Sequence, residues 1–125
     1  MKLIQVNSLL KLCNELKDMP MNVLLAYKFA KLKSKLTDED QFYTSKLQSI
    51  IGQYGEVDDE GKFIFTNNGN SIKIKEGLTE ECQAEIDILN AIDVELPDIH
   101  FTLQELDGLN LTINQMELLI DFIEE

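Results

Sequence analysis

One stretch decides the fold of this chain, the run from Met21 to Tyr54, which reads MNVLLAYKFAKLKSKLTDEDQFYTSKLQSIIGQY. It contains no proline, and no glycine before Gly52, so little in it opposes a helix. Apolar side chains recur along it at nearly heptad spacing, at Leu25, Phe29, Leu32, Leu36, Tyr43, Leu47, Ile50 and Tyr54. Such a stripe is typical of an amphipathic helix. At the standard rise, a helix over the whole run would be about 50 Å long.

The acidic residues around Thr37-Asp38-Glu39-Asp40 leave open whether this run is one helix or two. Thr37 followed by Asp40 resembles a capping arrangement, which favours two helices. The apolar stripe keeps its phase across these residues, so we expect one helix. Such a helix either packs within the chain or pairs with a second chain. The candidate helix interface consists of Leu25, Phe29, Leu32, Leu36, Tyr43, Leu47 and Ile50.

Shorter elements are expected before the long helix. Residues 1–6 are predicted to be a short strand or an extended lead-in. Asn7 or Ser8 suits the N-cap of a first helix that ends at about Lys17, because a short polar side chain accepts a hydrogen bond from the free amides of the first turn. Pro20 fits the first turn of the long helix, where its missing N–H costs nothing.

A β-hairpin is expected between Gly55 and Gly77. Its predicted strands are 63–66 and 71–75, and Asn67-Asn68-Gly69-Asn70 forms the turn, because asparagine and glycine tolerate positive φ. The second strand alternates isoleucine with serine and lysine. One side of the hairpin should therefore face a core and the other side water.

Residues 78–125 are predicted to form an acidic helical part. Thr79 is expected to cap its first helix, and residues 94–101 should be extended. Thr102 and Thr112 begin a short helical turn and the final helix through capping boxes. The apolar side chains expected on the two longer helices are Ile86, Leu89, Ile92, Ile113, Met116, Leu119, Ile120 and Ile123. The predicted fold is therefore α+β and mainly helical, a long helix packed with two or three shorter helices plus a short β-hairpin.

Composition favours a single domain over residues 1–125, with a helical part (1–54), a hairpin (55–77) and the acidic part (78–125). The chain is 44% hydrophobic and 27% charged, with only two prolines, which is the profile of a folded chain. No apolar run approaches the ~20 residues needed to span a bilayer, and the N-terminus does not resemble a signal peptide. We expect a cytoplasmic protein without membrane contact.

Charge limits the class of partner. Eleven lysines, no arginine and 23 acidic residues give a net charge of −12, and residues 56–125 carry −15 against +3 in residues 1–55. Arginine is the preferred residue for phosphate and base recognition, so direct nucleic-acid binding is not expected. A negative field steers a protein onto a basic surface. We therefore expect a protein partner with a basic groove, and the candidate acidic face is Glu80, Glu81 and Glu85.

No residue pattern points to a catalytic, cofactor or metal site, and none is expected. His100 is the single histidine and has no positioned nucleophile in its neighbourhood of the sequence. Asp58-Asp59-Glu60-Gly61 lacks the ligand spacing of a calcium loop. Cys13 and Cys82 are interpreted as small apolar side chains rather than a redox pair. The chain is therefore not expected to be an enzyme.

Three stretches resemble small uncharacterised proteins encoded by phages and prophages. They are residues 53–62, residues 72–76, and the closing part 103–112 with Gln115 and residues 122–125. The resemblance covers roughly residues 36–125 and rests on turn residues and element order. It implies a context, a phage product acting inside a bacterial cell, and carries no chemistry that could be assigned to a residue.

Two functional hypotheses follow. The first is a non-enzymatic phage-encoded binding protein, an inhibitor of a host or defence protein, acting through its acidic surface. The alternative is a phage structural or assembly component that forms a homo-oligomer through the long helix.

Overall fold

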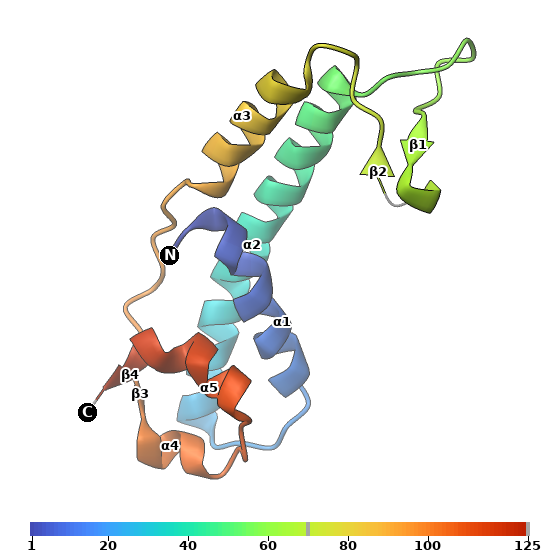
Figure 1. Ribbon diagram of the computed structural model, residues 1–125. Coiled ribbons are helices and arrows are strands. Elements are labelled where there is room, and N and C mark those ends of the chain that lie inside the picture. The colour runs from blue at the N-terminus through green and yellow to red at the C-terminus, as the bar shows by residue number, and fades with distance from the viewer. Residues whose placement is uncertain (70, 125) are drawn as a thin grey trace. The chain divides into compact units, whose positions relative to one another are not determined.

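The computed structural model describes residues 1–69 and 71–124, which form two compact units (Figure 1). Unit 1 consists of Met1–Asp40 and the described part of Asp93–Glu125, and unit 2 consists of Gln41–Ile92. The long helix α2, Val23–Tyr54, belongs to unit 1 in its first part and to unit 2 in its remainder. The predicted fold class, mainly helical α+β with one long helix and a small antiparallel hairpin, is confirmed.

The run that decides the fold is one helix, as predicted. The capping role considered for Thr37 is wrong, because its hydroxyl donates to the carbonyl oxygen of Lys33 at 2.8 Å within the helix. The role expected for Pro20 is also wrong, because α2 begins three residues later. Asn22 caps the helix instead, and its Oδ1 accepts a hydrogen bond from the amide of Leu25 at 2.9 Å.

The N-terminus is helical where a strand or extended segment was expected. The 3-10 helix η1 (Leu3–Gln5) leads directly into α1 (Val6–Leu16), which begins before the predicted caps Asn7 and Ser8. Leu3, Val6 and Leu9 are all at most 1% exposed. A helical path places residues three apart on one face and buries all three, whereas a strand would turn Leu3 and Val6 to opposite sides. Burial of these three side chains therefore favours a helix over the predicted extended segment.

The remaining elements of unit 1 are α4 (Leu103–Asp107), α5 (Ile113–Leu119), the 3-10 helix η3 (Ile120–Phe122) and two short strands. Both predicted capping boxes are confirmed. Thr102 Oγ1 accepts from the amide of Glu105 at 3.1 Å, and Thr112 Oγ1 accepts from the amide of Gln115 at 3.2 Å. Each box satisfies free amides at the start of a short helix that would not be stable alone.

Two features of this C-terminal region were not predicted. Strand β3 (Phe101–Thr102) pairs in parallel with β4 (Ile123–Glu124), the last described residues of the chain. The final helix also ends earlier than expected, at Leu119. Its first residue Ile113 is 79% exposed, and Ile120, which follows the helix, is 63% exposed. Leu119 is fully buried, as expected for the core-facing position.

The core of unit 1 forms where α1, the first part of α2, α4 and α5 meet. Phe29 of α2 stacks on Phe101 of β3 with ring centroids 4.7 Å apart. The N-terminal segment is held to the chain that follows unit 2, since the amide of Val94 donates to the carbonyl oxygen of Met1 at 2.8 Å. The buried side chains are Leu3, Val6, Leu9, Leu12, Cys13, Leu16, Leu25, Phe29, Leu32, Leu36, Val94, Ile99, Phe101, Leu106, Leu109, Leu119 and Phe122.

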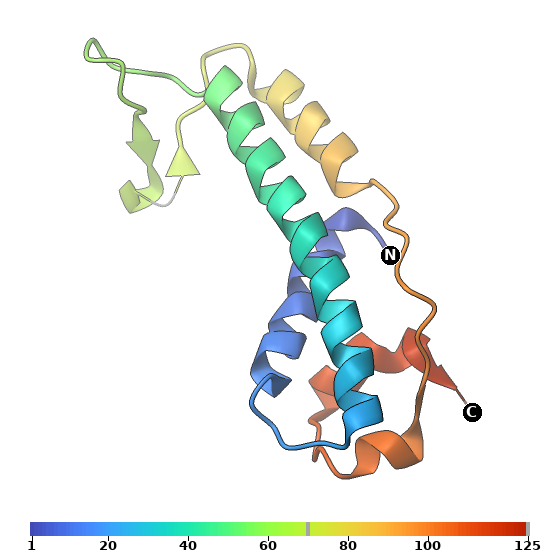
Figure 2. The ribbon, with the colours of Figure 1, turned by 180° about the vertical axis from the view of Figure 1, so that it is seen from behind.

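Unit 2 contains the second part of α2, the hairpin and helix α3 (Thr79–Asn90), which runs back along α2 (Figures 1 and 2). The predicted cap Thr79 is instead the first helical residue, and Leu78 occupies the N-cap position. Tyr43 joins the two helices, because its hydroxyl donates to Asn90 Oδ1 at 2.7 Å. The buried side chains of this unit are Ile50, Tyr54, Cys82 and Leu89.

The predicted hairpin is present, with strands shorter than expected. β1 (Phe65–Thr66) pairs antiparallel with β2 (Ser71–Ile72). Asn68 and Gly69 of the turn have φ of 58° and 88°, the left-handed values for which these residue types are suited. Asn70, the last residue of the predicted turn, lies outside the described residues. Along the second strand, Ile72 and Ile74 are half-buried and their neighbours exposed, which confirms the alternation.

Candidate protein-binding surface

The apolar stripe of α2, the candidate helix interface, lies largely inside the chain. Five of its members are at most 6% exposed, namely Leu25, Phe29, Leu32, Leu36 and Ile50. Tyr43 and Leu47 are half-buried. The five buried members pack inside the chain's own core, so a second chain could contact this stripe only at Tyr43 and Leu47 without unfolding the core. An interface formed by the stripe stays a prediction.

The three residues of the candidate acidic face differ in their exposure to solvent. Glu80 and Glu81 are exposed in the first turn of α3, where negative charge favours the positive end of a helix. Glu85 is half-buried and differs from them. Its Oε2 is screened from solvent and has no hydrogen-bond partner in the described part of the chain. The three carboxylates thus do not form one uniform surface.

Glu85 lies against the inner residues of unit 2. Burial, the charge of Glu85 and a hydrogen bond to this carboxylate raise the pKa of the Tyr54 hydroxyl. Burial, and after it the same carboxylate, raises the pKa of the Cys82 thiol. Both groups therefore stay neutral around pH 7, and neither is an activated nucleophile.

Acidic side chains without a basic neighbour are frequent in the last part of the chain. From residue 76 onward the sequence has no lysine and fourteen acidic residues. In residues 76–124, lysine ion pairs are formed by Asp93, with Lys2 at 2.8 Å, and by Glu105, with Lys28 at 2.9 Å. The exposed carboxylates with no ion pair in the described structure are Glu76, Glu80, Glu81, Asp87, Glu95, Asp107, Glu117, Asp121 and Glu124.

Asp87 is a member of the acidic face that sequence reasoning missed. It lies seven residues after Glu80, which places both on one side of α3. The amide of the Gln83 side chain donates to Asp87 Oδ1 at 2.8 Å, between the two carboxylates. The helical spacing was visible in the sequence and would have identified this residue.

A groove runs between the second part of α2 and α3, and we name it the α2–α3 groove. Its volume is about 230 Å³, and it lies wholly within unit 2. Its apolar rim is open, since Phe42, Ile88 and Ile92 are 51%, 70% and 40% exposed. The residues that line it are Phe42, Lys46, Ser49, Ile50, Gln53, Glu85, Ile88, Leu89 and Ile92.

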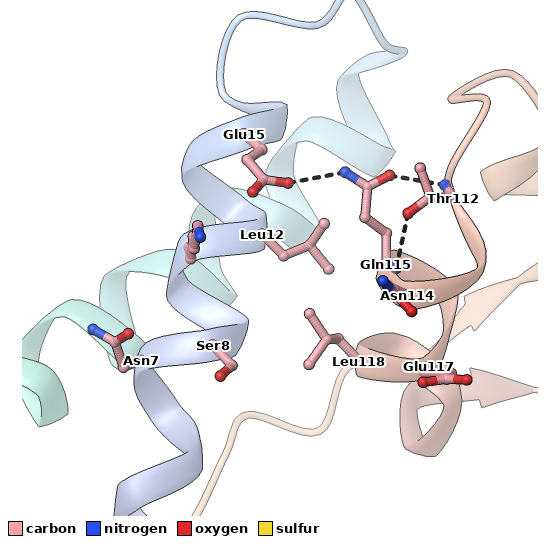
Figure 3. A pocket seen from close by; sticks show the side chains of 10 residues that line it. Asn7, Ser8, Leu12, Glu15, Thr112, Asn114, Gln115, Glu117 and Leu118 are labelled. Carbon is pink, nitrogen blue, oxygen red and sulfur yellow. Dashed lines mark hydrogen bonds between the residues drawn. The ribbon is translucent and has the colours of Figure 1, made fainter.

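A wider, polar groove lies between α1 and α5 in unit 1, with a volume of about 860 Å³ (Figure 3). Leu12 and Leu118 point toward one another between the two helices. Gln115 already makes its hydrogen bonds here, donating to Glu15 Oε2 at 2.9 Å and accepting from the amide of Thr112 at 2.9 Å. Side-chain amides, hydroxyls, two carboxylates and the Lys11 ammonium line this groove beside the two leucines, a composition suited to hydrogen bonding rather than to nucleophilic chemistry.

The other candidate sites have structural roles. His100 is exposed, and its ring contacts Asp98 at 2.7 Å, while its carbonyl oxygen accepts from Lys28. Asp58 Oδ1 accepts the amides of Glu60 and Lys62 at 2.9 and 3.0 Å, which makes residues 58–62 a hydrogen-bonded acidic turn. Among the described residues no group of three or more histidine, cysteine or acidic side chains is arranged to hold a metal ion.

Within residues 1–69 and 71–124, each helix is too short or too polar to cross a bilayer. Comparison of the chain with protein-family models, with curated proteins and with solved structures gave no match, so the resemblance to phage proteins stays a prediction.

Proposed function

We propose that this chain is a non-enzymatic protein-binding module that engages a basic protein surface through the exposed carboxylates of its last part. The proposal extends the predicted phage context, in which the partner would be a host or defence protein and binding would inhibit it. The observation that carries the proposal is the excess of exposed acidic side chains without ion pairs from Glu76 to Glu124.

This excess costs folding energy. Like charges on a folded chain repel one another, and lysines interspersed among them would relieve the repulsion. The first half of the chain does contain such lysines, and the last fifty residues contain none. A basic partner would supply the missing positive charge, accelerate association and set the orientation of the complex. Nucleic acid would be repelled by the same field.

The acidic side of α3 is the best-defined part of this surface. Glu80, Glu81 and Asp87 are exposed on a helix of twelve residues, which holds its side chains at fixed spacing. Glu85 is left out of the partner-binding set, because its carboxylate is turned against Tyr54. A rigid helix loses less conformational entropy on binding than a mobile loop with the same charges would lose.

The test is capture of partners from a bacterial extract by immobilised protein, followed by affinity measurements at increasing salt. Binding to a basic partner should weaken steadily with salt, and E80K/E81K should weaken it about tenfold or more. The matched control is D59K/E60K, which changes the net charge equally at the exposed acidic turn, residues 58–62.

Two results would count against the proposal. One is affinity that changes neither with salt nor in E80K/E81K. The other is equal weakening by D59K/E60K, which would show a general effect of net charge rather than a surface on α3.

A further inference from the structure

A pocket lies in unit 1 at the place where α1 ends and α2 begins, and we name it the α1–α2 pocket. Its volume is about 210 Å³. The most deeply buried residues that line it are Cys13, Leu16 and Phe29, each at most 6% exposed. Met19 and Met21, which are half-buried, come from the segment between the two helices. Methionine is flexible and polarizable, so this side of the pocket can adapt to an apolar ligand.

Small side chains on α2 leave this space open. Ala26 and Ala30 line the pocket, and their spacing of four residues places them on one face of the helix. Both are exposed in the described structure. An alanine side chain ends at its Cβ, so neither residue fills the space that a leucine would occupy there. The pocket therefore depends on these two positions, and a larger side chain at either of them should close it.

The charged residues that line the α1–α2 pocket are Lys17 and Lys33, whereas the α2–α3 groove and the groove between α1 and α5 both include carboxylates. Lys17 is exposed and Lys33 is half-buried, and neither forms an ion pair within residues 1–69 and 71–124. Burial raises the pKa of the Cys13 thiol to about 11, and the nearby charge of Lys33 opposes this rise. An apolar lining beside two unmatched cations is suited to an anion with an apolar tail.

We propose that the α1–α2 pocket binds a medium-chain aliphatic carboxylate, with its alkyl chain against the apolar lining and its carboxylate paired with Lys17 and Lys33. The volume sets the length of the chain. A methylene group fills about the space of a water molecule, roughly 30 Å³, so the pocket holds about seven of them. Octanoate has an alkyl chain of this length. The proposal does not depend on the acidic partner-binding surface, which lies in the last part of the chain.

Affinity should depend on both the length and the charge of the ligand. Each methylene group that the pocket buries should tighten binding about fourfold, so hexanoate should bind about tenfold or more weakly than octanoate. Chains longer than octanoate should gain much less per methylene, because the pocket is then full. Octylammonium should bind more weakly than octanoate, because Lys17 and Lys33 repel it. Non-specific binding to a chain of net charge −12 would favour the cation instead.

The experiment is titration of the full chain with octanoate, followed by NMR of ¹³C-methyl-labelled methionine. The chain has four methionines, of which Met19 and Met21 line the pocket. Their signals should shift and saturate with a dissociation constant of about 1 mM or lower, while the signals of Met1 and Met116 should stay unchanged. K33E, which reverses a charge of the pocket, and A30L, which fills it, should each weaken binding about tenfold or more.

The matched controls are K31E, a charge reversal on the same helix outside the pocket, and A84L, the same enlargement at an exposed position of α3. Both should bind octanoate as the wild type does, and so should E80K/E81K, which separates this pocket from the acidic surface. Circular dichroism checks the fold of A30L, and if A30L unfolds, K33E against K31E decides the outcome.

Three results would overturn the proposal. The first is a titration in which Met19 and Met21 do not shift up to about ten times the expected dissociation constant. The second is equal weakening by K33E and K31E, or unchanged binding in a folded A30L. The third concerns the acyl chains of a membrane, a second source of the same chemistry. Sedimentation with phosphatidylglycerol vesicles that K33E abolishes, without binding of free octanoate, would assign the pocket to a lipid surface instead.

Discussion

Glu105 offers a decisive stability test, because one carboxylate joins two parts of unit 1. Its Oε1 and Oε2 accept hydrogen bonds from Lys28 Nζ of α2 at 3.0 and 2.9 Å. Its Oε1 also accepts the amide of Thr102 at 3.0 Å and so completes the capping box of α4. Lys28 and Glu105 are only 24% and 20% exposed, so solvent screens the pair weakly.

The perturbation is E105Q, which keeps an acceptor for Thr102 and removes the charge. A hydrogen bond to a charged group contributes about 1.5–3 kcal/mol. Lys28 keeps its bond to the carbonyl oxygen of His100 at 2.8 Å, which favours the lower part of this range. We expect E105Q to lower the free energy of unfolding by about 1–2 kcal/mol. E105A also loses the cap and should cost about 2–3 kcal/mol.

The stability difference between the wild type and E105Q should depend on pH. The hydrogen bond from Lys28, and after it that from the Thr102 amide, lowers the pKa of Glu105 below its ordinary value of 4.5. A group with a lowered pKa in the folded state stabilises the fold fully above its unfolded pKa, and this contribution is lost as pH falls through the folded pKa. The stability gap between wild type and E105Q should therefore be constant near neutral pH and close below about pH 4.5.

The assay is urea unfolding followed by far-UV circular dichroism at neutral and acid pH, since the chain contains no tryptophan. E117Q serves as control, because Glu117 is exposed and makes no ion pair in the described structure. If E105Q is as stable as the wild type at neutral pH, or if the gap stays the same in acid, the reasoning is refuted.

Two further predictions concern glycines and thiols. G77A should lower the free energy of unfolding by about 1–2 kcal/mol, because Gly77 has φ of 83°, which a residue with a Cβ rarely adopts. G108A should change this free energy by less than about 1 kcal/mol, because Gly108 has φ of −74° and open space for a Cβ. Thermal unfolding of both variants checks the two values. Cys13 and Cys82 are each 3% exposed, and burial raises the pKa of Cys13 to about 11 against a smaller opposing effect of Lys33. Both thiols should react with a disulfide reagent at neutral pH only in denaturant, and fast labelling of the folded protein would contradict this.

Local chemistry made much of the fold predictable. Each capping box, at Thr102 and at Thr112, depends on two side chains three residues apart, so it forms without contacts from distant parts of the chain. The turn at Asn68 and Gly69 depends on two residue types that accept positive φ. The long helix depends on a stripe that keeps its phase. These features were correct because their causes lie within a few neighbouring residues.

The expectations that failed depended on distant contacts. Residues 1–6 follow a helical path because Leu3 and Val6 find a common core, and the pairing of Phe101 with Ile123 joins residues that share no local signal. Glu85 looked like its acidic neighbours until the packing of α3 on α2 turned its carboxylate toward Tyr54.

The sequence by itself determined the long helix, the turn, the capping boxes at Thr102 and Thr112 and the negative charge, since each follows from composition or short-range spacing. Tertiary structure decided which faces stay open. Most of the apolar stripe of α2 is buried in the chain's own core, and among the α2 residues that line the α2–α3 groove Phe42 is both apolar and exposed. Whether a side chain is covered depends on elements far away along the chain, and periodicity within one helix does not contain that information.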